Sequence, residues 1–241
     1  MKISLLCAAA LLALTACTAA PLESAAPETT PAQTAAPTPD PTEPPDATPA
    51  PTPQPTPVPE ETMYERYIDA FPAPDVESET TVTANGCTLT LEDSLDTEPE
   101  LLVYSSFVYR VTGDLAQLDT LLGEDLSFVG AMETEAASFQ RGEAGEDTQT
   151  IHELHTMTKE EVQGASDYTR KQLQQYLADY DLQQWTMVAV DQSWTYTPET
   201  EAAGPQLPAG EYQRYYLLGM PSGATEWKLY NVYWEDFYPQ Q

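Results

Sequence analysis

The only two histidines of the chain, His152 and His155, lie three residues apart with Glu153 between them. On a helix this spacing would let both imidazoles and the carboxylate bind one metal ion. The surrounding stretch TIHELHTMT, within residues 148–158, instead has the pattern of a strand, on which we expect the two histidines to point to opposite faces. Neither an HExxH motif, cysteine ligands nor an aspartate-rich loop accompanies them, so we expect no metal site.

A second place for chemistry is the stretch WTMVAVDQSWTYT, where Asp191 interrupts an apolar run and Tyr196 follows. An aspartate inside a pocket could act as an acid–base group, because burial raises its pKa. Alternation along the strand places Asp191 on the face opposite to Val188 and Val190, which favours solvent. The chain also lacks a Ser-His-Asp set, a Walker loop and a GxGxxG motif, so we expect no catalytic residue and no cofactor.

The three cysteines lie in different settings. Cys7 belongs to an apolar leader, which follows the positive start Met1-Lys2 and is too short to span a bilayer. Cys17 comes just after this leader, which has the pattern of a secretory signal. Cys87 stands alone in the foldable part, so we expect no disulfide there and interpret it as a small strand residue.

The run Leu14-Thr15-Ala16-Cys17 resembles the lipobox of bacterial lipoproteins. This resemblance implies a lipoprotein signal peptide over residues 1–16, peptidase cleavage between Ala16 and Cys17, and a diacylglyceryl group on the Cys17 thiol. The protein would then be lipid-anchored on the extracellular face of the cell membrane. The alternative is a plain signal peptide that is cut near Ala19-Ala20.

Residues 18–62 contain 14 of the 22 prolines and almost no apolar side chain that could form a core. Together with the lipidated cysteine they form the linker 17–62, which we expect to be disordered and extended, as a Pro/Thr-rich stalk. The formal net charge of the chain is −30, which repels phosphate backbones and excludes nucleic acid as a partner. The remaining partners, besides the membrane, are a cell-wall component, a glycan or a protein.

Helix caps locate the first elements of the foldable part, which we divide into an N-terminal extension, 63–96, and a domain, 97–241. Thr97 and Glu100 form a capping box, and Gly113 ends the helix that follows. Asp114 begins a short helix, and a further helix is expected from Met132 to Gln140. A second capping box at Thr158 and Glu161 predicts one long helix that continues through Tyr180.

Most of the strands follow these helices, which favours an α+β fold with helices packed on a curved antiparallel sheet. Asn85-Gly86 predicts a hairpin before the first helix, and EYQRYYLLGM and EWKLYNVYW predict two late strands. The stretches LVYSSFVYRVTGDLAQLDTLLGED, HTMTKEEV and EWKLYNVYW resemble the NTF2-like (cystatin-like) superfamily. That resemblance implies a cone in which a curved sheet wraps a long helix, over about residues 97–237.

Aromatic residues gather near the end of the chain: Trp227, Tyr230, Tyr233, Trp234, Phe237 and Tyr238. Strict alternation predicts Trp227 and Tyr233 on one face and Tyr230 and Trp234 on the other. These residues form either core on both faces or an exposed binding surface for a glycan or a protein.

Two functions remain open from the sequence. The first is a non-catalytic binding or scaffold module displayed on the stalk, which predicts a cone filled by apolar side chains and an exposed aromatic patch. The second is a small enzyme of the isomerase or dehydratase type, which predicts an open pocket holding a buried Asp, Glu or His. We favour the first, because few titratable residues are expected to point inward.

Overall fold

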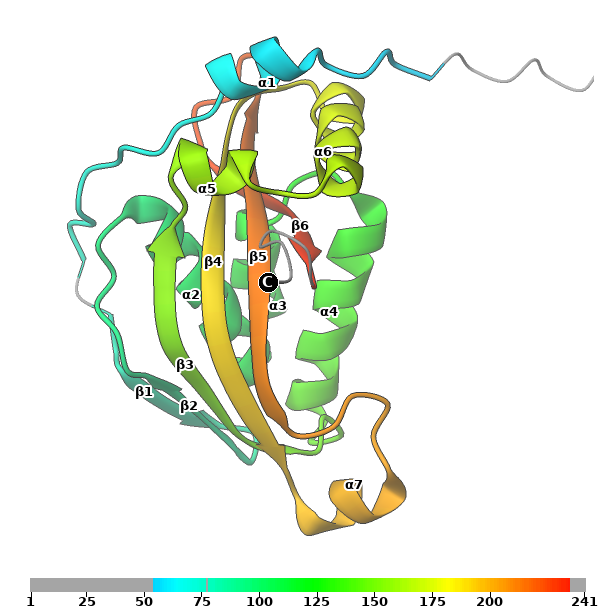
Figure 1. The fold of residues 1–241 in the computed structure, drawn as a ribbon. Helices are drawn as coiled ribbons and strands as arrows, with labels where there is room; N and C mark the ends of the chain where they lie inside the picture. Colours follow the sequence, from blue (N-terminus) through cyan, green and yellow to red (C-terminus); the bar gives the residue numbers. More distant parts are fainter. Residues whose placement is uncertain (1–53, 77, 235–241) are drawn as a thin grey trace, which may run out of the picture. The chain divides into compact units, whose positions relative to one another are not determined.

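The computed structural model describes residues 54–76 and 78–234, which all fall in one compact unit (Figure 1). This part of the chain is an α+β fold with seven helices and one six-stranded mixed sheet. The predicted signal peptide, Cys17, most of the predicted stalk, Phe237 and Tyr238 lie outside the described residues. None of the described helices is long and apolar enough to cross a lipid bilayer.

The elements alternate between groups of helices and strands along the chain. The helices are α1 (Glu60–Glu65), α2 (Glu98–Thr112), α3 (Leu115–Leu121), α4 (Leu126–Gln140), α5 (Lys159–Gln163), α6 (Asp167–Asp179) and α7 (Pro198–Ala203). The strands are β1 (Thr81–Ala84), β2 (Cys87–Leu91), β3 (Glu146–Thr156), β4 (Leu182–Tyr196), β5 (Gly210–Pro221) and β6 (Lys228–Tyr233).

Helices α2 and α3 begin where their caps predict. Thr97 accepts a hydrogen bond from the backbone N–H of Glu100, whose side chain in turn accepts from Thr97, so the capping box of α2 is confirmed. Gly113 ends α2 in the left-handed region, with φ 71°, which glycine adopts without a steric cost. Asp114 caps α3 as predicted, while α4 starts earlier than expected because Asp125 accepts from two backbone N–H groups.

The predicted long helix from Thr158 to Tyr180 is wrong, because the chain forms two helices there. The capping box at Thr158 does start α5, but α5 ends after one turn at Gly164. Ser166 then caps a new helix, α6, by accepting from the backbone N–H of Thr169. Arg170 stabilises the break, because its Nη1 donates to the carbonyl oxygens of Gln163 and Ala165.

The sheet has the strand order β1-β2-β3-β4-β5-β6, so neighbours in the chain are also neighbours in space. Asn85 and Gly86 form the predicted hairpin turn, both with positive φ (50° and 82°), and Asn85 Nδ2 donates to the Val111 carbonyl at the end of α2. The hairpin belongs to residues 63–96, and these residues therefore contribute two strands to the same sheet as the rest of the domain.

The expectation of a wholly antiparallel sheet is wrong at one pair, because β2 and β3 are parallel. The other adjacent strands are antiparallel. Helices α2, α3 and α4 all lie between β2 and β3 in the chain and carry it back across the sheet (Figure 1). A connection of this length is what parallel neighbours require, whereas a tight turn can join only antiparallel ones.

Both faces of the sheet are covered, and we name them by their helices. On the α2 face, helices α2, α3 and α4 pack on alternate strand residues, among them Val188, Val190, Tyr216 and Leu218. On the α6 face, helices α1, α5 and α6 pack on the residues between these, including Met187, Ala189 and Leu217. The long strands β4 and β5 are therefore apolar on both faces where helices cover them.

Helix α1 and the segment that follows it are fastened to the α6 face by buried polar contacts. The indole Nε1 of Trp185 donates to the Met63 carbonyl at 2.8 Å, and the Tyr67 hydroxyl donates to the Met157 carbonyl at 2.6 Å. The rings of Tyr67 and Trp185 meet edge to face, with centroids 4.6 Å apart.

Candidate functional site

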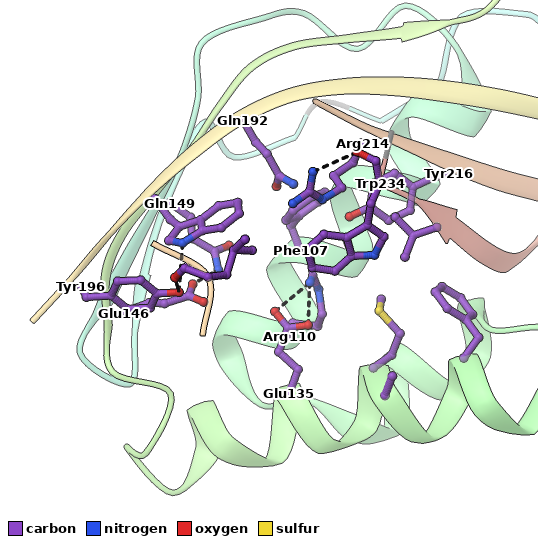
Figure 2. A pocket seen from close by; sticks show the side chains of 16 residues that line it. Phe107, Arg110, Glu135, Glu146, Gln149, Gln192, Tyr196, Arg214, Tyr216 and Trp234 are labelled. Carbon is purple, nitrogen blue, oxygen red and sulfur yellow. Dashed lines mark hydrogen bonds and ion pairs between the residues drawn. The ribbon is translucent and has the colours of Figure 1, made fainter. Parts of the chain in front are cut away.

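A cavity of about 310 Å³ lies on the α2 face, between helices α2 and α4 and strands β3 to β6 (Figure 2). Along β4 and β5, polar and aromatic residues replace the apolar core residues on the same face, so the packing of the core gives way to an open space. Gln192, Trp194 and Tyr196 continue the face of Val190, and Arg214 continues the face of Tyr216.

Arg110 of α2 lies at the base of this cavity and is only 6% exposed. Its Nη1 donates to both carboxylate oxygens of Glu135 on α4, at 2.8 and 2.9 Å, and its guanidinium lies 4.3 Å from the ring centroid of Phe107. Burial by itself would lower the pKa of Arg110, but the Glu135 carboxylate raises it above its usual value, so the guanidinium stays charged. Its Nη2 has no hydrogen-bond partner within the described residues.

Glu146 and Gln149, both on β3, form the opposite wall (Figure 2). Burial raises the pKa of Glu146, and the nearby Glu135 carboxylate raises it further. Gln149 Nε2 donates to Glu146, which partly offsets this effect. Gln149 is 8% exposed, and its Oε1 is buried without a hydrogen-bond partner in the part of the chain that the structure describes.

Aromatic rings complete the lining. Trp194 stacks on Tyr212 with centroids 4.2 Å apart and an interplanar angle of 11°. The Trp194 indole donates to the Tyr196 hydroxyl at 3.1 Å, and that hydroxyl donates to a backbone carbonyl, so both rings are held in place. The Arg214 guanidinium lies 3.9 Å from the ring centroid of Trp234, which is 54% exposed at the cavity.

The charges of the lining balance. Arg110 and Arg214 face Glu135 and Glu146, so the formal charges sum to zero when both carboxyls are ionised. In a chain of net charge −30, two of the nine basic residues are gathered here. This cavity is therefore a neutral polar site in an otherwise acidic protein.

The two histidines lie outside this cavity, and the expectation that they point to opposite faces is wrong. A β-bulge between Ile151 and Glu153 shifts the register of β3 against β4. His155 is paired with Ala189 and shares the α6 face, and His152 reaches Ser193, which lies on that same face of β4. No group of three or more potential metal ligands gathers anywhere in the described residues.

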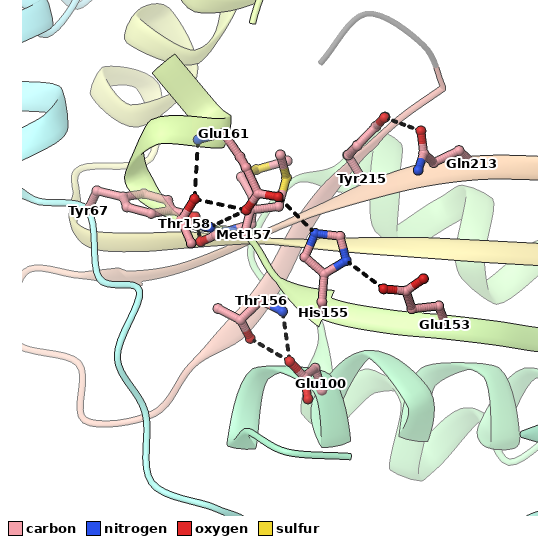
Figure 3. A network of polar contacts seen from close by, with 11 residues as sticks. Tyr67, Glu100, Glu153, His155, Thr156, Met157, Thr158, Glu161, Gln213 and Tyr215 are labelled. Atoms are coloured by element: carbon pink, nitrogen blue, oxygen red, sulfur yellow. Dashed lines mark hydrogen bonds and ion pairs between the residues drawn. The ribbon is translucent and has the colours of Figure 1, made fainter. Parts of the chain in front are cut away.

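The two histidines have separate partners. His155 lies 3.7 Å from Glu153 and 3.4 Å from Glu161 (Figure 3). His152 Nδ1 lies 2.7 Å from Glu92 Oε2, and its Nε2 lies 2.8 Å from Ser193 Oγ. Ser193, His152 and Glu92 are therefore linked by hydrogen bonds in the order serine, histidine, carboxylate, as in acyl-transfer enzymes.

This serine is nevertheless a poor nucleophile candidate. Ser193 lies on β4 and is paired with Thr150 of β3 on one side and Glu211 of β5 on the other. The backbone N–H groups around it are therefore used in hydrogen bonds between the strands. An oxyanion needs free donors beside the nucleophile, and a strand paired on both sides does not offer them. We therefore interpret the three side chains as cross-strand hydrogen bonding on the exposed end of the α6 face.

The structure places the other candidate residues as follows. Asp191 lies on the face opposite to Val188 and Val190, as predicted, at a shallow surface depression with His152 and Glu211. Cys87 is buried in the α2 face, and burial raises the pKa of its thiol to about 12, which makes it unreactive at neutral pH.

The late aromatics do not alternate as predicted. Tyr230 and Tyr233 both pack on the α6 face, whereas Trp227 packs on the α2 face and Trp234 lines the cavity. The reason is an irregularity in the pairing of β5 with β6, between Leu217 and Leu218. The aromatics are therefore divided between two cores and the cavity.

No protein-family model, curated protein or solved structure matches the chain. Apart from Tyr196 and Trp234, the residues that line the cavity were not selected from the sequence, because they come from six different elements. Two of them carry a signal that could have been used. Arg110 and Arg214 are single basic residues inside apolar stretches, LVYSSFVYRV and YQRYYLL, of a chain that has few basic residues.

Proposed function

We propose that this protein is a ligand-binding module, anchored to the outer face of a cell membrane through Cys17 and carried on a Pro/Thr-rich stalk, that binds a small polar molecule in the cavity on the α2 face. The stalk ends earlier than residue 62, because Val58 is buried and α1 begins at Glu60, so residues 58–62 of the predicted linker belong to the fold. We further propose that the fold is an NTF2-like cone, in which α2, α3 and α4 close one side of the sheet around that cavity. The observation that carries the binding role is the pair of buried, unpartnered polar atoms in it, Arg110 Nη2 and Gln149 Oε1. Buried polar atoms without partners are costly, and a ligand that pairs with them removes this cost.

The site differs from what the sequence predicted for a binding module, namely an interior filled by apolar side chains and an exposed aromatic patch. The expectation that few titratable residues point inward is wrong, because Arg110, Glu135 and Glu146 line the cavity. Pockets of this kind, with aromatic walls and a few convergent polar groups, are the usual form of a small-molecule site. Trp194, Tyr196 and Trp234 supply the aromatic walls, and Arg110 and Gln149 the converging polar groups.

Filling the cavity tests this role. Ala131 on α4 lies at the edge of the cavity and is exposed, so Ala131→Trp would close the space without removing a polar group. Glu133→Trp is the matched control, because Glu133 is exposed on the same helix and does not line the cavity. In ligand-detected NMR against a library of small polar compounds, we expect compounds that bind the full-length chain and Glu133→Trp but not Ala131→Trp. Compounds that bind all three proteins equally would contradict a site in this cavity.

A second candidate is an enzyme of the isomerase or dehydratase type, and one observation favours it. Glu146 is a partly buried carboxyl group with a raised pKa inside the cavity, as a general acid or base would be. A compound found in the NMR experiment is incubated with the protein in D₂O. Exchange of a carbon-bound hydrogen that is lost in Glu146→Gln would support the enzyme, and an unchanged compound supports binding alone.

A further inference from the structure

We propose that the cavity binds one neutral sugar ring in the pyranose form, an inference that rests on the proposed function. Three independent properties of the lining point to this ligand class: the unpartnered polar atoms, the aromatic walls, and the balance of charge.

The unpartnered atoms require a ligand that both accepts and donates hydrogen bonds. Arg110 Nη2 is a donor in need of an acceptor, and Gln149 Oε1 is an acceptor in need of a donor. Both side chains are more than nine-tenths buried and both line the cavity (Figure 2). A hydroxyl group accepts and donates at once, and a pyranose carries several around one ring, so adjacent hydroxyls can pair with both side chains.

The aromatic walls suit the other surface of a sugar. Pyranose rings present C–H groups on their faces, and these pack on flat indole and phenol rings. Trp194 is fixed by its stack on Tyr212 and its hydrogen bond to Tyr196, and Trp234 is fixed by the guanidinium of Arg214. The ring of Trp194 is therefore held in place before a ligand enters, which reduces the entropy lost on binding.

The balance of charge favours a neutral ring over a charged one. Nη1 of Arg110 already donates to both carboxylate oxygens of Glu135. An anionic ligand that bound at Nη2 would therefore lie close to the negative charge of Glu135 and be repelled by it. A cationic ligand would be brought close to that same guanidinium. The cavity volume of about 310 Å³ is at the lower end of ligand sites, which are roughly 300–1,000 Å³, and fits a single ring.

The test uses neutral monosaccharides together with charged analogues of the glucose ring. The neutral probes are the methyl glycosides of glucose, galactose, mannose and N-acetylglucosamine, and the charged probes are glucuronate and glucosamine. Two of the four tryptophans, Trp194 and Trp234, line the cavity, so intrinsic fluorescence of the full-length chain reports binding. We expect at least one neutral probe to give a saturable change, with both charged analogues of the glucose ring about tenfold weaker than methyl glucoside or undetectable.

Variants localise the effect. Trp234→Ala should weaken the tightest sugar about tenfold or more, and because Trp234 is half exposed its loss does not open the core. Gln149→Leu should weaken the same sugar about tenfold by leaving a hydroxyl unpaired. The control is Tyr168→Ala on α6, since Tyr168 is an exposed aromatic residue away from the cavity, and it should bind as the wild type does. Equal binding by Trp234→Ala and Tyr168→Ala would overturn the proposal.

The remaining outcomes separate this proposal from the proposed function. The neutral-sugar proposal is overturned if glucuronate binds most tightly. It is also overturned if no sugar gives a response while other compounds still distinguish Ala131→Trp from Glu133→Trp. In both cases the proposed role as a small-molecule binding module still stands. If no compound distinguishes those two variants, the sugar proposal and the proposed binding function are both overturned. A tetrasaccharide of the tightest sugar identifies the source: tighter binding than the methyl glycoside indicates a chain end, and equal binding indicates a free sugar.

Discussion

Glu100 joins the start of α2 to the end of β3, and its removal is the sharpest test of how the helices are held on the sheet. The side chain is 3% exposed and accepts four hydrogen bonds. Oε2 accepts from the backbone N–H groups of Asp96 and Thr97, at 2.7 and 3.0 Å, and so completes the capping box. Oε1 accepts from the backbone N–H and the hydroxyl of Thr156, at 2.7 and 3.0 Å (Figure 3).

The expected loss of stability in Glu100→Ala follows from these contacts. Loss of the cap interaction costs about 1 kcal/mol, because the freed N–H groups of the first turn can turn to water. Loss of a hydrogen bond to a charged group costs about 1.5–3 kcal/mol, and the Thr156 N–H and hydroxyl both lose their bonds to Glu100 Oε1. We therefore expect a decrease of about 3 kcal/mol in the free energy of unfolding, which corresponds to roughly 6–12 °C in Tm for a domain of this size.

Urea denaturation followed by tryptophan fluorescence measures this change in the full-length chain. Glu98→Ala is the matched control, because Glu98 is exposed in the same helical turn and should change the free energy of unfolding by less than about 0.5 kcal/mol. Glu100→Gln should lower the free energy of unfolding by an amount between those of Glu98→Ala and Glu100→Ala, because its amide NH₂ group would face a backbone N–H donor in place of a carboxylate oxygen. A loss below about 1 kcal/mol in Glu100→Ala, or a loss equal to that of Glu98→Ala, would refute the reasoning.

Three further predictions concern the cavity, the core and the anchor. Burial raises the pKa of Glu146 in the folded state, so this group stabilises the fold at low pH and loses that contribution as the pH rises through the raised value. The stability of Glu146→Gln relative to the wild type should therefore increase as the pH rises above about 4.3, the ordinary pKa of a glutamate, and a constant difference would contradict the burial. A Cβ at Gly123 would lie 2.5 Å from the ring of Tyr230, so Gly123→Ala should lower the free energy of unfolding by about 1–3 kcal/mol. Gly130→Ala is the control, because its Cβ would meet no atom within 4 Å, and it should raise the free energy of unfolding slightly. Equal effects of the two substitutions in thermal melts would exclude the clash. Cys17→Ala should move the protein from the membrane fraction to the medium or the soluble fraction, and an unchanged distribution in cell fractionation would argue against a lipid anchor at this residue.

The features that could be predicted from the sequence are those in which the interacting residues lie within one turn of each other. The capping boxes at Thr97 and Thr158 depend on residues three positions apart, and the turn at Asn85-Gly86 depends on two adjacent residues; all form as expected. The break between α5 and α6 is also local, but Gly164 and Ser166 compete with an apolar stripe that continues on both sides of them. The apolar stripe predicted one continuous helix, but in the structure the helix stops at Gly164 and Ser166 caps a new one.

The long-range features could not be predicted, because they depend on how distant strands pair. The bulge in β3 that brings His152 to the face of His155, and the irregularity in β5 and β6 that brings Tyr230 to the face of Tyr233, each reverse a simple alternation. The cavity depends on still more separated parts, since Arg110 and its partner Glu135 lie on different helices, and the opposite wall comes from strands. Composition could indicate only that few basic residues are available for such a site.

The attachment of α1 to the α6 face has a mechanical consequence. Tension that enters the domain from its amino-terminal side first reaches two contacts with α6: the Pro55 carbonyl accepts from Gln175 Nε2, and the Val58 backbone N–H donates to the Gln174 carbonyl. The next contacts along the chain are the Met63 carbonyl with the Trp185 indole, and then the pairing of Ile68 with the Trp185 carbonyl. Because these contacts are arranged in series, a pulling force would break them one after another before it acted on the sheet, and the cavity on the opposite face would keep its shape under loads that detach α1.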